Sequence, residues 1–126
     1  MIAEDFRGEF VRRALAAEPV LVHLYSNDYT PSSLRPPSLD QLVEVTGSDY
    51  AAKRISPTSW SVEAEAAVAP PVRWDFEHRH GAVVGYFVTG VESRLLLWAE
   101  RFVDGPYRME AAQDSITIDP RVTWAG

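Results

Sequence analysis

Two histidines separated by one residue are the first candidates for chemistry in this sequence. His78 and His80 would project from the same side of an extended strand, because side chains alternate along a strand. Two imidazoles placed in this way can chelate a metal ion, and Asp75 and Glu77 lie nearby as oxygen donors. A solvated strand end that leads into a turn explains the same pattern, and the spacing indicates no third ligand. We therefore predict no metal ligand and no cofactor.

A pair of carboxylates is the second candidate. Glu63 and Glu65 alternate with small apolar residues, so one strand would present both side chains on one face. Such pairs can perform the general acid and base steps of glycan cleavage. Alternation is also typical of an ordinary half-exposed strand, and the neighbouring residues predict no cleft that would raise a carboxyl pKa. We predict no catalytic residues and no enzyme. A small glycan-active enzyme that uses Glu63 and Glu65, or Asp75 and Glu77, is an alternative.

Other functional signatures are missing from the sequence. No serine stands in a G-x-S-x-G turn, and the seven glycines form no phosphate-binding loop. The chain has no cysteine, which excludes disulfides and thiolate ligands. A net charge of −6 disfavours binding to nucleic-acid phosphates. The acidic N-terminus and the lack of a long apolar run predict a soluble protein that is not exported by a Sec-type route and does not bind a membrane.

Two neighbouring runs, Ala82–Thr89 and Arg94–Phe102, are apolar on both of their alternating faces. In the second run, one face would carry Leu95, Leu97 and Ala99, and the other Leu96, Trp98 and Phe102. A strand with two apolar faces needs a partner on each. One face is expected in the core, and the other against the N-terminal helix or a second copy of the protein. The predicted interface residues are Phe6, Phe10, Tyr86, Trp98 and Phe102.

The elements that would position these residues are one helix followed by many short strands. Glu4–Ala17 predicts an amphipathic helix with Phe6, Phe10, Ala14 and Ala17 on one side and Val11 and Leu15 on its flank. A loop rich in proline and serine follows at 26–37, and Ser38 is expected to cap a short helix that continues to Val45. The expected strands are Val20–Tyr25, Lys53–Ile55, Trp60–Val68, Val72–His78, Ala82–Thr89, Arg94–Phe102, Tyr107–Glu110, Ser115–Ile118 and Val122–Trp124.

This pattern predicts a mainly β fold in one domain over residues 1–126. A helical segment at 1–18 would precede a β-rich body at 19–126. Many short strands separated by turns are typical of an antiparallel β-sandwich or jelly roll, here with an N-terminal helix and one short additional helix.

In their order along the chain, these elements resemble small uncharacterised virion structural proteins of tailed bacteriophages. The resemblance lies in an apolar strand leading into an Asn-x-x-Thr-Pro loop, a short acidic Leu-rich helix, a Tyr-Ala step, a central Trp, two apolar strands and a final β run broken by Pro. These are Leu21–Pro31, Leu39–Glu44, Tyr50–Ala51, Trp60, Gly85–Thr89, Leu97–Phe102 and Ile116–Pro120. Ser48-Asp49 departs from the pattern, which has a Gly before the Tyr, and so does Pro36-Pro37.

The resemblance implies a structural role in the virion and no catalytic residues. It favours a capsid decoration or cement protein that forms trimers and contacts the major capsid protein. Such a protein would reside on the capsid surface, and in the host cytoplasm before assembly. A tail, baseplate or fibre component that touches other tail proteins or host surface glycans is the nearest alternative.

Overall fold

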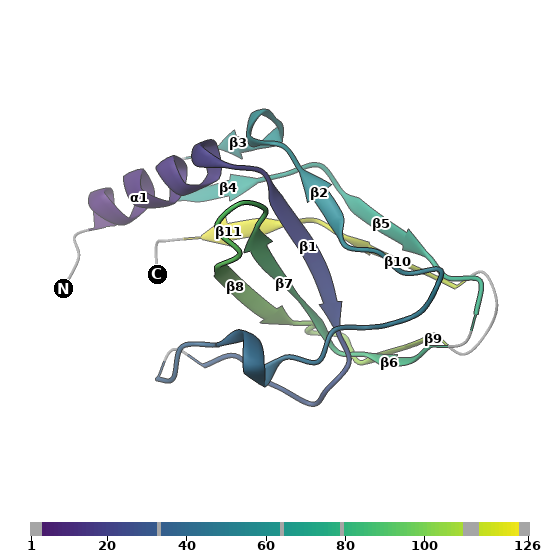
Figure 1. Cartoon of the computed structure of the whole chain (residues 1–126). Helices are drawn as coiled ribbons and strands as arrows, with labels where there is room; N and C mark the ends of the chain where they lie inside the picture. The colour runs from purple at the N-terminus through teal and green to yellow at the C-terminus, as the bar shows by residue number, and fades with distance from the viewer. Residues whose placement is uncertain (1–3, 33, 64, 79, 110–113, 124–126) are drawn as a thin grey trace.

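A four-stranded antiparallel sheet stands at the centre of the molecule (Figure 1). The computed structural model describes residues 4–32, 34–63, 65–78, 80–109 and 114–123, with side chains from Gly8 onward. The order of the central strands is β2 (Lys53–Ile55), β1 (Val20–Tyr25), β7 (Gly85–Gly90) and β8 (Leu96–Arg101). Every residue of β1 pairs with β7, so Val22 lies opposite Val88.

Three smaller antiparallel sheets complete the described fold. They are β11 (Arg121–Thr123) with β4 (Ala66–Val68) and β3 (Ser61–Val62), β10 (Ser115–Ile118) with β5 (Val72–Asp75), and β6 (Gly81–Val83) with β9 (Tyr107–Met109). Helix α1 (Glu4–Ala17) precedes them and contacts the 3₁₀ turn η2 (Pro57–Ser59). The predicted fold class is confirmed: the protein is mainly β, with antiparallel sheets and a helix near the N-terminus, as in a β-sandwich.

The main core lies on the inner face of the central sheet. Val20, Val22 and Leu24 point into it at alternate positions of β1, and Trp74 and Phe76 fill its far side. The Trp74 indole can be buried because its N–H donates a hydrogen bond to the carbonyl of Ala51 at 2.8 Å.

Helix α1 has the predicted bounds, but its buried side differs from the prediction. Leu15 is buried and Val11 is half-buried, whereas Phe10 is 67% exposed and Ala17 is exposed. The helix therefore lies against the sheets on the flank that carries Val11 and Leu15. Its rotation places the bulky Phe10 ring at the surface. The side chain of Phe6 lies outside the described residues.

The run Ala82–Thr89 forms two strands instead of the predicted single strand. The break is at Val84, whose N–H donates to the carbonyl of Tyr25 at 2.9 Å and whose carbonyl accepts the N–H of Phe102 at 3.0 Å. The chain here leaves its pairing with β9 and begins its pairing with β1 and β8.

Trp60–Val68 was also predicted as one strand, but it folds back on itself. β3 and β4 form a hairpin in which Val62 pairs with Ala67, and the N–H of Glu63 donates to the carbonyl of Ala66 at 2.7 Å. Because the chain reverses direction between β3 and β4, β4 pairs with β3 on one edge and with β11 on the other. Glu63 and Glu65 therefore lie at the hairpin turn and do not share the face of one strand.

Three other predicted strands differ at their ends: Val72–His78, Arg94–Phe102 and Val122–Trp124, of which the last begins one residue earlier, at Arg121. Val72–His78 ends as a strand at Asp75, because Asp49 binds the backbone N–H groups that follow. The run from Arg94 becomes regular only at Leu96, after the β7–β8 turn. The predicted final residues Glu110 and Trp124 lie outside the described residues.

The predicted helix from Ser38 to Val45 is reduced to a single 3₁₀ turn, η1 (Leu39–Gln41). The side-chain amide of Asn27 donates to the carbonyl of Gln41 at 2.8 Å and accepts the N–H of Val43 at 2.9 Å. These contacts occupy backbone groups that a longer helix would need for its own hydrogen bonds. Beyond η1 the chain is extended, and Glu44 forms a β-bridge with Tyr25.

A bulge in β8 changes the predicted distribution of side chains between its faces. Val88 pairs with Trp98, but the next residue, Thr89, pairs with Leu96. Leu97 is thus an extra residue in the ladder. It packs with Trp98 against the main core, while Leu96 lies with Ala99 on the other face.

That other face is covered by Tyr29 of the long loop and by Leu42, just after η1. Phe87 of β7 and Ala99 of β8 form a second small core there with Tyr25 and Val84, and Tyr29 and Leu42 pack on it. The cover predicted for this face was the N-terminal helix or another copy of the protein. The structure instead uses the long loop, which Asn27 holds closed.

Candidate functional site

The predicted histidine pair lies in the loop between β5 and β6. The imidazole of His80 is buried against Phe76, with ring centroids 4.6 Å apart, and its Nε2 lies 2.5 Å from Oδ1 of Asp49. His78 is exposed, and its backbone N–H donates to the other carboxylate oxygen of Asp49. One imidazole is therefore part of the fold and the other faces solvent.

The predicted acidic candidates are dispersed over the surface. Glu63, Glu65, Asp75 and Glu77 are all exposed, and Asp75 accepts a hydrogen bond from Arg73 at 2.8 Å. Within the described residues, no group of three or more histidines, aspartates or glutamates could hold a metal ion.

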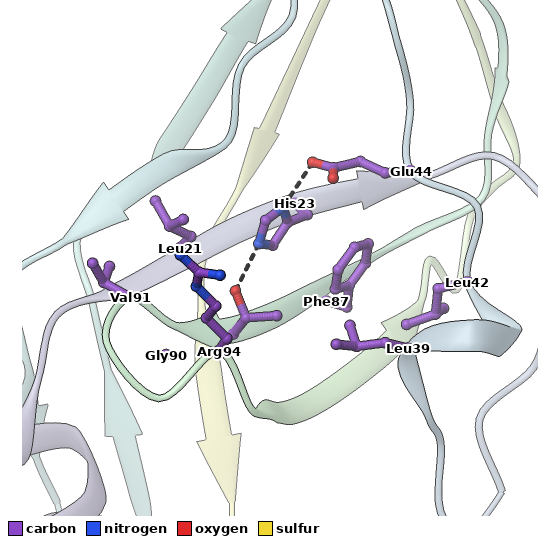
Figure 2. A pocket seen from close by; sticks show the side chains of 10 residues that line it. Leu21, His23, Leu39, Leu42, Glu44, Phe87, Gly90, Val91 and Arg94 are labelled. Carbon is purple, nitrogen blue, oxygen red and sulfur yellow. Dashed lines mark hydrogen bonds and ion pairs between the residues drawn. The ribbon is translucent and has the colours of Figure 1, made fainter.

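A polar array on the outer face of the central sheet was not among the predicted sites. Nδ1 of His23 lies 2.7 Å from Oε2 of Glu44, and Nε2 of His23 lies 2.8 Å from the hydroxyl of Thr89 (Figure 2). An ionised carboxylate only accepts hydrogen bonds, so Nδ1–H donates to Glu44. In the neutral imidazole, Nε2 is then left to accept the Thr89 hydroxyl. The ring also stacks on Phe87, with centroids 4.5 Å apart and planes 6° from parallel.

The carboxylate of Glu44 is held by two donors. The hydroxyl of Tyr50 donates to Oε2 of Glu44 at 2.6 Å, and itself accepts the N–H of Leu24 at 3.0 Å. Burial acts to raise the pKa of Glu44, but the hydrogen bonds from His23 and Tyr50 outweigh it and leave that pKa lowered. Burial raises the pKa of the Tyr50 hydroxyl. The array is therefore a fixed arrangement of an ionised carboxylate, an imidazole and a hydroxyl.

This array forms the polar part of a pocket of about 380 Å³. The pocket is lined by Leu21, His23, Leu39, Leu42, Glu44, Phe87, Thr89, Gly90, Val91 and Arg94 (Figure 2). Its floor is formed by β1 and β7, one wall by η1 with the residues after it, and the opposite wall by the turn between β7 and β8 (Figure 2). Arg94, in that turn, is the one arginine or lysine among the residues that line the pocket.

A second, apolar cleft of about 120 Å³ lies between α1 and the sheets. It is lined by Phe10, Val11, Ala14, Leu15, Leu97, Trp98 and Val122. Two of the predicted interface residues, Phe10 and Trp98, therefore meet at one surface although they are far apart in the sequence. The indole of Trp98 packs edge to face against Trp60, with ring centroids 6.0 Å apart.

Tyr86 and Phe102, which were also predicted to lie at the interface, are more deeply buried in the fold. Tyr86 is 4% exposed, and its hydroxyl donates to Glu100 at 2.9 Å. Phe102 is half-buried between Tyr86 and Tyr107, with ring centroids 6.3 and 5.0 Å away. These two residues stabilise the inner side of β7 and β8 and present little surface to a partner.

The His23 array gave almost no signal in the sequence. Its three members lie 21 and 66 residues apart, so no local motif joins them. The one available clue is that His23 interrupts an apolar strand, Val20–Tyr25. Alternation along this strand places the His23 side chain on the face that points away from the core.

Comparison with known proteins returned no match to a family model, a curated protein or a solved structure. No helix in the described part of the chain has the length and apolar character needed to cross a membrane.

Proposed function

We propose that this protein is a bacteriophage virion structural protein, a capsid decoration protein that associates with copies of itself and with the major capsid protein. The observation that carries this proposal is the apolar cleft at α1. Phe10 lies at its rim with two thirds of its surface exposed, next to the half-buried Trp98. An aromatic side chain at the edge of a well-formed apolar cleft is typical of an association surface.

Contacts between the segments that carry the phage resemblance support the proposal. Arg101 of the Leu97–Phe102 segment binds Asp28 at 2.5 Å and the hydroxyl of Thr30 at 3.3 Å, both in the Asn-x-x-Thr-Pro loop. Asn27 of the same loop fixes the segment around η1. Three of the segments on which the resemblance rests are therefore in direct contact in the folded chain.

The chemistry of the surface is compatible with this role. A net charge of −6 keeps the protein soluble before assembly and away from packaged nucleic acid. On a capsid shell, each copy would contribute a modest apolar contact, and multivalency would make the binding of the assembled copies much stronger than that of one copy. We propose a homotrimer in which the cleft at α1 receives the neighbouring copy.

The solution mass of the protein tests self-association, measured by light scattering after size exclusion. We expect a trimer for the natural chain and a monomer for Phe10→Glu, because a charge would be buried at the association surface. Leu34→Glu is the matched control: Leu34 is 94% exposed and lies outside the cleft, so that variant should remain a trimer. Circular dichroism establishes that both variants fold.

Location in the virion is tested by immunogold electron microscopy of virions from a host that produces this chain. Label over the capsid, lost in Phe10→Glu, supports the decoration role. Label confined to the tail would replace it with the tail alternative. A folded monomer that is absent from virions would refute the structural role.

A further inference from the structure

We propose that the pocket over β1 and β7 binds a small monocarboxylate with an apolar body, and that Arg94 binds its carboxylate. This proposal is independent of the role in the virion, because it concerns a different surface from the cleft at α1. It rests on the backbone of Arg94, on the state of its guanidinium and on the composition of the pocket.

Arg94 occupies a backbone conformation that favours glycine. Its φ is 61°, and its N–H donates to the carbonyl of Gly90 at 3.1 Å to close the turn between β7 and β8. Glycine or asparagine adopts this left-handed conformation with less strain. Strained residues cluster at functional sites, so an arginine at this position points to a use for its side chain.

The guanidinium of Arg94 has no partner among the described residues, unlike those of Arg73 and Arg101, which pair with aspartates. Figure 2 shows the Arg94 side chain at the pocket, reaching toward Leu21. A guanidinium offers several donors in a planar fork that matches a carboxylate. An anion that enters the pocket would find this group available.

The rest of the pocket determines the kind of anion. Both nitrogens of His23 are already engaged by Glu44 and Thr89, so the floor offers no further strong donor from that ring. If the first negative charge of a ligand is bound by Arg94, any further charge on the same ligand is repelled by the carboxylate of Glu44. This disfavours phosphates and dicarboxylates. The remaining lining is mostly aliphatic or aromatic, with Leu39, Leu42 and Phe87 opposite the arginine side. An apolar body with a single carboxylate satisfies all three conditions.

The arrangement of Thr89, His23 and Glu44 resembles a nucleophile with its base, but the surrounding backbone favours binding over acyl transfer. An oxyanion would need free N–H donors near Thr89. The N–H groups of Gly90, Val91 and Arg94 are already bonded to the carbonyls of Leu95, Pro19 and Gly90, respectively. The array is therefore proposed to shape the floor of a binding site.

Titration of the natural chain with benzoate and with hexanoate, followed by ¹H–¹⁵N NMR, tests the proposal. We expect saturable shifts at His23, Thr89 and Arg94 with a dissociation constant on the order of 1 mM for at least one of the two acids. Benzamide and hexanamide, which have the same bodies without the charge, should bind about tenfold more weakly or worse.

Variants separate Arg94 from general charge effects. Arg94→Gln should weaken carboxylate binding at least about tenfold, whereas Arg54→Gln, an exposed arginine outside the pocket, should leave it unchanged. If Arg94→Gln fails to fold, Arg94→Asn replaces it, because asparagine tolerates the left-handed backbone. Equal binding of the amides, unchanged binding by the Arg94 variants, or no saturable binding of either acid to the natural chain would overturn the proposal.

Discussion

Asp49 and His80 form a buried pair in which a carboxylate oxygen lies 2.5 Å from Nε2 of the imidazole, and their side chains are only 7% and 6% exposed. The other carboxylate oxygen of Asp49 accepts the backbone N–H groups of Glu77 and His78 at 2.7 and 3.0 Å. One aspartate thus fixes the loop between β5 and β6. It also keeps His80 from acting as the metal ligand that its spacing from His78 would allow.

Replacement of Asp49 by asparagine should change how stability depends on pH. Burial acts to raise the pKa of Asp49, but hydrogen bonds from His78, Glu77 and His80 hold it at about 2, below its ordinary value of 3.8. A group with a lowered folded pKa stabilises the fold above its unfolded pKa, and this contribution is lost as the pH falls from about 4 toward 2. We expect Asp49→Asn to be less stable at pH 7 and to lose less stability in this range.

Urea unfolding at pH 7, 4 and 2.5 measures this effect. Glu65→Gln, which removes an exposed carboxylate at the β3–β4 turn, is the matched control and should follow the natural chain. A pH profile for Asp49→Asn identical to that of the natural chain would contradict the assignment.

Replacement of Tyr50 by phenylalanine should destabilise the fold by about 1–3 kcal/mol. Its hydroxyl donates to Glu44 and accepts the N–H of the buried Leu24. Leu24 lies in the part of β1 that extends past its pairing with β2. Loss of the hydroxyl leaves that backbone donor without its partner. Tyr29→Phe removes a single hydrogen bond to the side chain of Gln41, so it should cost less. Denaturant unfolding of the two variants compares them, and equal costs would argue against the Tyr50 assignment.

Replacement of Gly85 by alanine should cost at least about 2 kcal/mol, because the added methyl group has no space. A Cβ at this position would collide with the backbone carbonyl of Glu100 and lie 2.5 Å from the ring of Tyr25. Gly81→Ala is a useful contrast: a Cβ there meets nothing within 4 Å, but its φ of 75° makes any side chain strained, at about 1 kcal/mol. In thermal unfolding, Gly85→Ala should have a lower midpoint temperature than Gly81→Ala.

Replacement of Arg94 by glycine should stabilise the fold by about 1 kcal/mol, because glycine relieves the left-handed backbone at φ 61°. The same variant should no longer bind a monocarboxylate. A higher unfolding midpoint combined with lost binding would distinguish a residue kept for a ligand from one that stabilises the turn. A lower midpoint would show that the arginine supports the fold.

Local patterns predicted several elements well. The helix Glu4–Ala17 and the strands Val20–Tyr25, Lys53–Ile55 and Ser115–Ile118 have the predicted bounds. Their periodicity reflects contacts with one dominant core, and such contacts repeat along the chain. The predicted helix after Ser38 was wrong because Asn27, more than ten residues earlier, binds its backbone. The strand breaks at Val84 and at the β3–β4 turn depend in the same way on distant partners.

The sequence by itself determined that this is a mainly β protein with an N-terminal helix, because alternation and turn residues act over a few neighbouring positions. Only the tertiary structure decided what covers the second apolar face of β7 and β8, and that His23, Glu44 and Thr89 meet in the pocket that Arg94 also lines. Both depend on pairing register and loop closure, which bring together residues far apart in the sequence, 66 positions in the case of His23 and Thr89, and no short motif records such contacts.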